Sequence, residues 1–180
     1  MHDDDILVSG CIKGDRDRQW ELYQKYAPRM MVVCLRYCRC REDAEDVLQE
    51  AFVKVFNHIN TYRRESSLAY WIKRIVINTA LNLHRKSVYL YPHLDIDETH
   101  DVGEEDHIST NYHFKDLLAI LQTLPQGCQV VFNLYAIEGY KHREIAEMLQ
   151  ITEGTSKSQY ARARMLLKEM ITETGEIRHG

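Results

Sequence analysis

The stretch "KHREIAEMLQITEGTSKSQYARARMLLKEM", residues 141–170, decides how the C-terminal part of the chain folds. Its first third carries Ile145, Ala146 and Leu149 at the spacing of one helix face. The residues "QIT" break this pattern, and a Thr-Glu-Gly-Thr sequence then starts a second helix. Two helices around a short break are typical of a helix-turn-helix, whose second helix enters the DNA major groove. The stretch therefore predicts DNA binding.

The second helix of this stretch has two different sides. Steps of four, three, four and three residues place five side chains on one side, which we expect to be core: Ser156, Tyr160, Ala163, Leu167 and Met170. The other side carries Lys157, Ser158, Ala161 and Arg162, with Gln159 and Arg164 at its margins. Cations on an isolated helix usually serve only to solvate a surface. Here the turn, the core side and the cationic side agree, which favours the helix-turn-helix.

The acidic residues of the chain are concentrated in its middle. The formal net charge of the 180 residues is −4. Residues 87–116 contain one Lys or Arg and eight Asp or Glu, whereas residues 1–86 contain 15 and 12, and residues 117–180 contain seven of each. Because the middle is acidic and poor in apolar residues, it predicts a flexible linker over residues 88–113. The flanking parts are compatible with local patches that contact a polyanion.

The composition is that of a globular protein, with 44% hydrophobic and 28% charged residues. We find no apolar run of the roughly 18–20 residues that span a bilayer. The first residues, "MHDDDILVSG", are acidic where a secretory signal would be basic. Five cysteines without framework spacing suit a reducing compartment. We therefore expect a cytoplasmic protein.

The first 86 residues predict helices and almost no strand. In "REDAEDVLQEAFVKVFNHI", residues 41–59, the apolar residues recur at three- and four-residue steps. These inward residues are Ala44, Val47, Leu48, Ala51, Phe52, Val55 and Ile59. A further helix follows Ser66 or Ser67 as its N-cap; its inner face is Leu68, Trp71, Ile72, Ile75, Thr79 and Leu83. Pro28 either starts a new helix or kinks a continuous one.

The sequence as a whole thus predicts an all-α protein. Two small helical domains, residues 1–87 and 114–180, are joined by the acidic flexible linker 88–113. The segments "DAEDVLQEAFVKVF", "WIKRIVINTALN" and "LPQGCQVVFNLYAIEGYKHREIAEMLQITEGTSKSQYARAR" follow one another in this order. Their order and spacing resemble the extracytoplasmic-function (ECF) subfamily of bacterial sigma factors over nearly the whole chain. The resemblance implies a helical initiation factor that binds core RNA polymerase, recognises a promoter and opens it.

The resemblance implies a polymerase-binding role for the helix around residues 43–56, which in such factors docks on the clamp of the large catalytic subunit. The matching exposed positions are Asp46, Gln49 and Glu50, with Asp43 and Lys54 as weaker candidates. Charged and amide groups on a rigid helix suit charge-assisted hydrogen bonds with arginine-rich helices. Without the resemblance, a solvated acidic face would be the favoured interpretation.

The next segment resembles the part of the family that captures the minus-ten element as a single strand. An extruded base needs aromatic faces and an amide around it, and Tyr62 and Asn78 match the positions that form such a pocket. The candidates for phosphate contacts are Lys73, Arg74, Arg85 and Lys86. Trp71 is expected to pack in the core. Arg64 stands where the family often has Gly, which leaves the loop shape and the preferred base open.

For the duplex minus-thirty-five element, the resemblance points to the second helix of the helix-turn-helix. The matching positions are Lys157, Ser158, Gln159, Ala161 and Arg162, with Thr155 and Arg164 near phosphates. Relatives frequently have Arg where Gln159 stands; because Gln pairs with adenine as Arg pairs with guanine, the base preference is open to change. Relatives also frequently have Val for Ser156 and a turn Gly for Gln150. Gln150 would be strained if the turn requires positive φ.

Other groups of residues give weaker indications. Cys34 and Cys38 lie one helical turn apart and near Cys40, so a zinc or redox site is conceivable, but small buried thiols are the favoured interpretation. Five histidines are scattered through the linker region: His84, His93, His100, His107 and His113. We expect no metal, no cofactor, no small-molecule substrate and no catalytic nucleophile.

Partners and rival functions follow from the same observations. The resemblance implies contacts with the polymerase clamp and flap region, with promoter DNA and with an anti-sigma factor. A conventional helix-turn-helix regulator would explain the last 40 residues only, and a cysteine-based redox or metal sensor would rest on three thiols.

Overall fold

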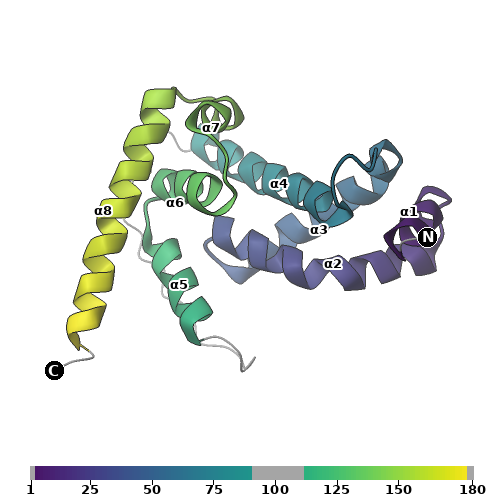
Figure 1. The fold of residues 1–180 in the computed structure, drawn as a ribbon, viewed down its shortest axis with the longest axis horizontal. Helices are drawn as coiled ribbons and strands as arrows, with labels where there is room; N and C mark the ends of the chain where they lie inside the picture. The colour runs from purple at the N-terminus through teal and green to yellow at the C-terminus, as the bar shows by residue number, and fades with distance from the viewer. Residues whose placement is uncertain (1–2, 91–111, 178–180) are drawn as a thin grey trace. The chain divides into compact units, whose positions relative to one another are not determined.

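The computed structural model describes residues 3–90 and 112–177, and the side chains of residues 3–82 and 117–170 (Figure 1). The chain divides into two units, Met1–Tyr89 and Leu90–Gly180. The residues within the described ranges form helices and turns and contain no strand, which confirms the all-α prediction. None of the helices in these ranges is long and apolar enough to cross a membrane.

The helices of the two units follow in simple order along the chain. The N-terminal unit contains α1 (Asp3–Ile12), α2 (Arg16–Tyr37), α3 (Arg41–His58), the 3-10 turn η1 (Ile59–Thr61) and α4 (Leu68–Leu90). The C-terminal unit contains α5 (Tyr112–Thr123), α6 (Gln126–Phe132), the π-helical turn η2 (Asn133–Ile137), α7 (His142–Leu149) and α8 (Glu153–Ile177). The ends of α4 and α5 fall a few residues inside the expected linker, and its residues 91–111 lie outside the described residues.

The first two helices begin and end at clear signals. Three aspartates occupy the first turn of α1, where they suit the positive end of the helix dipole. Gly14 follows α1 with φ +77°, a backbone conformation that glycine adopts without strain. Asp15 then caps α2 by accepting the N–H groups of Asp17 and Arg18 at 3.0 and 3.3 Å. Pro28 lies inside α2, so of the two predicted alternatives the structure has the continuous helix.

The core of the N-terminal unit is built from apolar faces of α2, α3 and α4. All seven residues predicted to face inward from residues 41–59 are buried. Ser67 is the N-cap of α4, since its Oγ accepts the Tyr70 N–H at 3.3 Å. Of the predicted inner face of α4, Leu68, Ile72 and Thr79 are buried, Ile75 is half-buried, and the Leu83 side chain lies outside the described residues. The helix also buries Val76, Ile77, Ala80 and Leu81. Trp71 is only half-buried.

The C-terminal unit has a separate core in which α8 packs on α5 and α6. Its buried members are Leu121, Leu124, Cys128, Ala163 and Leu167, with Ile120, Phe132 and Leu166 partly buried around them. After α6 the backbone widens into the π-helical turn, where the Glu138 N–H donates to the Asn133 carbonyl at 3.0 Å. This core presents one side of α8 inward.

The predicted helix-turn-helix is formed by α7 and α8. Ile145 is fully buried, whereas Ala146 and Leu149 are half-buried. Gln150 ends α7 at φ +56° and ψ 42°, so the turn does require the left-handed conformation. Thr152 then caps α8, because its Oγ1 accepts the Thr155 N–H at 3.0 Å.

Candidate functional site

The exposed face of α3 presents acidic and amide side chains on a regular helix. Asp43, Asp46 and Gln49 are exposed. Glu50 is also exposed, and its Oε1 lies 2.6 Å from Lys54 Nζ. Lys54 is different from the others, because its half-buried ammonium also donates to Thr79 Oγ1 of α4 at 3.2 Å. The structure therefore ties Lys54 into the framework of its own unit, whereas the other candidates are exposed on the surface of α3.

An apolar residue was missed on this face. The side chain of Val53 is 59% exposed, although α3 is otherwise amphipathic. It follows Gln49 by four residues and Glu50 by three, so the three side chains are neighbours on the helix surface. The signal was present in the sequence, because Val53 breaks the three- and four-residue spacing of the core residues.

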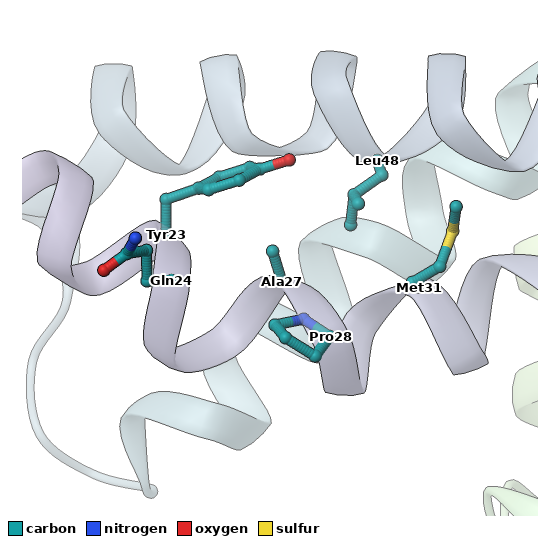
Figure 2. A pocket seen from close by; sticks show the side chains of 6 residues that line it. All are labelled: Tyr23, Gln24, Ala27, Pro28, Met31 and Leu48. Atoms are coloured by element: carbon teal, nitrogen blue, oxygen red, sulfur yellow. The ribbon is translucent and has the colours of Figure 1, made fainter. Parts of the chain in front are cut away.

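An open groove of about 470 Å³ lies between α2 and α3 (Figure 2). Five residues of α2 and one of α3 line it: Tyr23, Gln24, Ala27, Pro28, Met31 and Leu48. At one end, the ring of Tyr23 stacks on exposed Trp20 at 5.8 Å and meets Phe52 edge-on at 4.8 Å. Sequence analysis did not identify this groove, because it forms between two different helices, with Leu48 of α3 opposite the residues of α2.

Tyr62 lies in the loop between η1 and α4 and is half-buried. Its hydroxyl donates to the Ser66 carbonyl at 2.7 Å, and its ring centroid lies 5.6 Å from that of Trp71. Burial raises the pKa of Tyr62, and the nearby negative charge of Asp4 adds to this effect. The hydroxyl therefore keeps its proton at neutral pH. The two rings form an aromatic pair at the N-terminal end of α4.

Asn78 lies seven residues beyond Trp71 on α4 and is exposed. Two helical turns separate the two residues by about 10 Å along the axis, on the same side of the helix. Arg74 is exposed between them, and half-buried Lys73 places its ammonium 5.8 Å from the ring centre of Tyr70. Tyr70 is 43% exposed and was missed as a candidate stacking surface. The side chains of Arg85 and Lys86 lie outside the described residues.

The exposed side of α8 carries most of the predicted duplex-reading residues. Thr155, Lys157, Ser158, Ala161, Arg162 and Arg164 are all exposed. Lys157 pairs with Glu153 at 2.7 Å, and this contact lowers the pKa of the Glu153 carboxyl. Met165, which was not predicted, is 54% exposed on the same side. The structure thus brings these cations and small side chains onto one helical face.

Gln159 departs from this arrangement. It is half-buried, and its Oε1 accepts a hydrogen bond from Cys128 Sγ of α6 at 2.9 Å. A Cβ placed on Gly127 would lie 3.4 Å from the Gln159 amide atoms, so that the amide packs directly over the first turn of α6. The structure therefore turns Gln159 away from the exposed cationic face and toward the core.

A group of rings joins α7 to α8. Buried Ser156 forms a 2.9 Å hydrogen bond between its Oγ and His142 Nδ1. The His142 ring stacks on Tyr135 with centroids 4.3 Å apart, and Tyr135 in turn contacts Tyr160 at 4.5 Å. On the outer edge, the Arg164 guanidinium lies 5.9 Å from the centre of the Tyr160 ring. These contacts fix the angle between the two helices of the helix-turn-helix.

Two of the three clustered cysteines are buried, as the favoured interpretation predicted, and the third is exposed. Cys34 and Cys38 are buried, and burial raises the pKa of each thiol to about 12, so neither is a thiolate at neutral pH. Cys40 is exposed, and all five thiols are free. Among the residues with described positions, no cluster of three His, Cys, Asp or Glu side chains is arranged to hold a metal ion. The histidines of the linker region fall outside the described side chains.

Comparisons with known families agree with this two-unit arrangement. The family model described as Sigma-70 region 2 matches residues 22–88, and the one described as Sigma-70, region 4 matches residues 114–167. The ECF RNA polymerase sigma-E factor of Haemophilus influenzae is 29% identical over 181 residues, covering 93% of this chain and 95% of the relative. The RNA polymerase sigma-H factor of Pseudomonas aeruginosa is 28% identical, covering 89% and 90%.

Two similar solved structures are complexes. CnrH in complex with the cytosolic domain of CnrY is 19% identical, with a TM-score of 0.51 over 93% of this chain and 96% of that one. The sigma factor RpoE in complex with the anti-sigma factor NepR from Bartonella quintana is 20% identical, with a TM-score of 0.58 over 84% and 95%. At these identities the likeness concerns the fold alone.

Proposed function

The chain belongs to the ECF subfamily of RNA polymerase sigma factors, which direct polymerase to promoters, and we propose that its two units divide promoter recognition between a single strand and a duplex. Factors of this family bind RNA polymerase and DNA, and they have no catalytic chemistry of their own. The observation that supports this division is that one chain contains two different kinds of surface. The N-terminal unit has an aromatic loop beside a polar stripe of α4, and the C-terminal unit has a cationic helix-turn-helix. The protein would act in the cytoplasm, where polymerase and promoter DNA lie.

The exposed face of α3 is our proposed contact with the polymerase clamp. Asp43, Asp46, Gln49 and Glu50 present carboxylates and an amide on a rigid helix, and such groups form oriented hydrogen bonds with arginine side chains. Lys54 has a supporting role in this proposal, because it holds Glu50 and bridges to α4. Val53 adds an apolar contact in the middle of the polar face.

The minus-ten element would be captured as a single strand along α4 and the loop before it. The Tyr62 and Trp71 rings offer faces on which a base can stack, and the exposed Asn78 amide can pair with a base edge. Lys73, Arg74, Arg85 and Lys86 are the proposed phosphate contacts. A base must leave the duplex to be held in this way, so the same contacts would favour promoter opening.

The minus-thirty-five element would be read as duplex by the exposed side of α8. Lys157, Ser158, Ala161 and Arg162 are proposed to meet base edges and nearby phosphates, while Thr155 and Arg164 lie toward the sugar-phosphate backbone. Gln159 is assigned a supporting role, because its amide packs against α6. The C-terminal unit would also contact the polymerase flap region.

An anti-sigma factor is part of the same proposal. One of the similar solved structures is a sigma factor bound to the anti-sigma factor NepR. A protein that covers the α3 face or the α8 face of this chain would block polymerase or promoter binding. Its identity has to come from copurification with the full chain.

Reconstitution with core polymerase tests the proposal. We expect transcription from a specific promoter only when this chain is added. A conventional regulator would instead bind duplex DNA and leave polymerase unaffected, which would refute the proposal.

The polymerase contact has its own test. The double variant Gln49→Ala, Glu50→Ala should bind core polymerase more weakly while its thermal unfolding stays unchanged. Glu147→Ala is the matched control, since it removes another glutamate in an i,i+4 pair, from α7 of the other unit. Equal core affinity of the double variant and the control would contradict the assignment to α3.

A further inference from the structure

The loop that carries Tyr62 contains a backbone conformation that its residue type disfavours. Arg64 has φ +63°, in the left-handed region where a Cβ meets the backbone. Glycine adopts this conformation freely, but arginine adopts it only when surrounding contacts hold it there. The contact that holds Arg64 therefore decides the shape of the loop.

The contact that holds Arg64 comes from the first helix of the same unit. Asp5 of α1 lies 2.9 Å from Arg64 Nε through its Oδ1. The Asp5 side chain is 33% exposed and the Arg64 side chain 60%, so the pair is at the surface but partly shielded on the Asp5 side. Helix α1 also contacts η1, which leads directly into the loop. The ion pair thus joins the first helix to the loop.

Asp5 is a fixed anchor because α1 is itself tied to α2. Lys25 Nζ lies 2.6 Å from Asp3 Oδ2 and 2.9 Å from Asp4 Oδ1. The Tyr26 hydroxyl donates to the same Asp4 oxygen at 2.7 Å. These three contacts hold the first turn of α1 in place on α2, so that Asp5 is held beside Arg64.

The ring of Tyr62 depends on the path of this loop. Its hydroxyl donates to the Ser66 carbonyl, two residues beyond Arg64, and its ring faces Trp71 at the start of α4. If Arg64 left the left-handed region, the Ser66 carbonyl would move and the ring pair would lose its arrangement. The position of Tyr62 is therefore coupled to the Asp5–Arg64 pair.

We infer that Asp5 and Arg64 are positioning residues for single-strand capture: their ion pair holds the loop in the shape that presents the Tyr62 and Trp71 rings to an extruded base. This inference rests on the proposed function of Tyr62. Arg64 acts through backbone shape, and its guanidinium is engaged with Asp5 instead of serving mainly as a phosphate contact. Helix α1 becomes a structural support of the minus-ten site.

The first test compares two aspartates of α1 in holoenzyme. The probe is a single-stranded oligonucleotide that carries the minus-ten element of a promoter transcribed by the reconstituted enzyme. Asp5→Ala should lower the affinity for this probe by about two- to five-fold, the range of a partly exposed ion pair. Asp3→Ala removes the same charge from the same helical turn, but it loses only one of the three contacts that hold α1, while Asp4 still binds Lys25 and Tyr26. Its loss of affinity should therefore be smaller than that of Asp5→Ala. Equal affinities of the two variants would overturn the inference.

The second test separates backbone shape from charge at position 64. Arg64→Gly removes the guanidinium but accepts φ +63°, so it should bind the probe nearly as well as the wild type. Arg64→Ala removes both the ion pair and the guanidinium and keeps the backbone strain, so it should lose the most. Asp5→Ala added to Arg64→Gly should cause no further loss. A phosphate contact by Arg64 would make the Gly and Ala variants equally weak, and that result would contradict the inference.

Two further measurements distinguish positioning from general stability and from the proposed function itself. In a Trp20→Phe background, the emission of Trp71 should shift more on Asp5→Ala than on Asp3→Ala, while the unfolding midpoints of both stay alike. An unshifted emission counts against positioning. Tyr62→Ala tests the proposed function alone: if it leaves probe binding intact, the role of Tyr62 fails. If it weakens binding while Asp5→Ala matches Asp3→Ala, only the positioning inference fails.

Discussion

The N-terminal unit holds its proposed DNA-reading loop by an exposed ion pair, whereas the C-terminal unit holds its proposed DNA-reading helix by a buried hydrogen bond and a stack of rings. An exposed pair such as Asp5–Arg64 contributes about 0–1 kcal/mol. Leaving buried Ser156 unpaired would cost about 1–3 kcal/mol, and each aromatic pair adds about 0.5–1.5 kcal/mol. The difference suits the two targets, because a single strand needs an adaptable site and a duplex groove presents a fixed shape.

The largest expected effect comes from destabilising one of the two units, the C-terminal one. Leu121→Ala should destabilise the C-terminal unit by about 2–5 kcal/mol, because it leaves a cavity in that core. Duplex minus-thirty-five binding should fall with it, while single-strand binding by holoenzyme remains. Leu117→Ala, at a 49% exposed position of the same helix, is the control for helix propensity. Unfolding followed by circular dichroism would measure both, and an equal loss in the two variants would contradict this core assignment.

A smaller effect tests whether the helix angle depends on the ring group. His142→Ala should lower duplex affinity and stability by about 1–3 kcal/mol, since buried Ser156 loses its partner. Adding Ser156→Ala should recover part of the stability, because both polar partners are then absent. Titration calorimetry with a minus-thirty-five duplex measures the affinities of the two single variants and the double variant, and denaturant unfolding measures their stabilities. Strictly additive losses would show that the two residues act independently.

A third change tests the supporting role of Gln159. Gln159→Met keeps the length of the side chain but loses the hydrogen bond with Cys128, at a cost of about 0.5–1.5 kcal/mol in stability. We expect the preferred base at each promoter position to stay the same in a library of minus-thirty-five duplexes. Arg162→Ala is the comparison, as an exposed residue of the same helix whose loss should weaken binding. A changed base preference in Gln159→Met would show that the amide reads DNA after all.

The smallest effect compares the two left-handed residues. Gln150→Gly should stabilise the C-terminal unit by up to about 1 kcal/mol, because relief of the left-handed strain exceeds the added chain entropy of glycine. Arg64→Gly relieves similar strain but loses its ion pair, so we expect nearly unchanged stability there. Differential scanning calorimetry measures both shifts in Tm. A lower Tm for Gln150→Gly would mean that the Gln150 side chain makes a stabilising contact that outweighs the strain.

Local patterns were enough to predict the helices and most of the exposed and buried faces. The apolar spacing of residues 41–59 predicted which of their side chains are buried. In the second helix of the helix-turn-helix, Ser156, Ala163 and Leu167 are buried as predicted, whereas Tyr160 and Met170 are half-buried. These features depend on neighbours within a few residues, which a single sequence displays directly. The positive φ of Gln150 was expected from the resemblance, because relatives frequently have Gly at this turn position.

Contacts between distant residues were beyond such patterns. Gln159 lies at the margin of its helix, and its direction is decided by Cys128, 31 residues earlier. Arg64 is held by Asp5, which precedes it by 59 residues. Trp71 was expected in the core because it falls on the inner face of its helix, but it is half-buried and pairs with Tyr62 of the preceding loop. In each case the partner lies outside the residue's own helix or loop, so spacing along that segment does not identify it.

The widened turn η2 makes the number of residues in this part of the chain important. Its hydrogen bond from Glu138 to Asn133 spans five residues where a regular helix spans four. Removing a residue that precedes Tyr135 in the turn would move its ring back by one helical position, about 100° about the axis and away from His142. The length of the turn therefore sets the position of Tyr135 relative to His142. We expect the ring group that aligns the proposed DNA-reading helix to tolerate substitutions in the turn better than a change in the length of the turn.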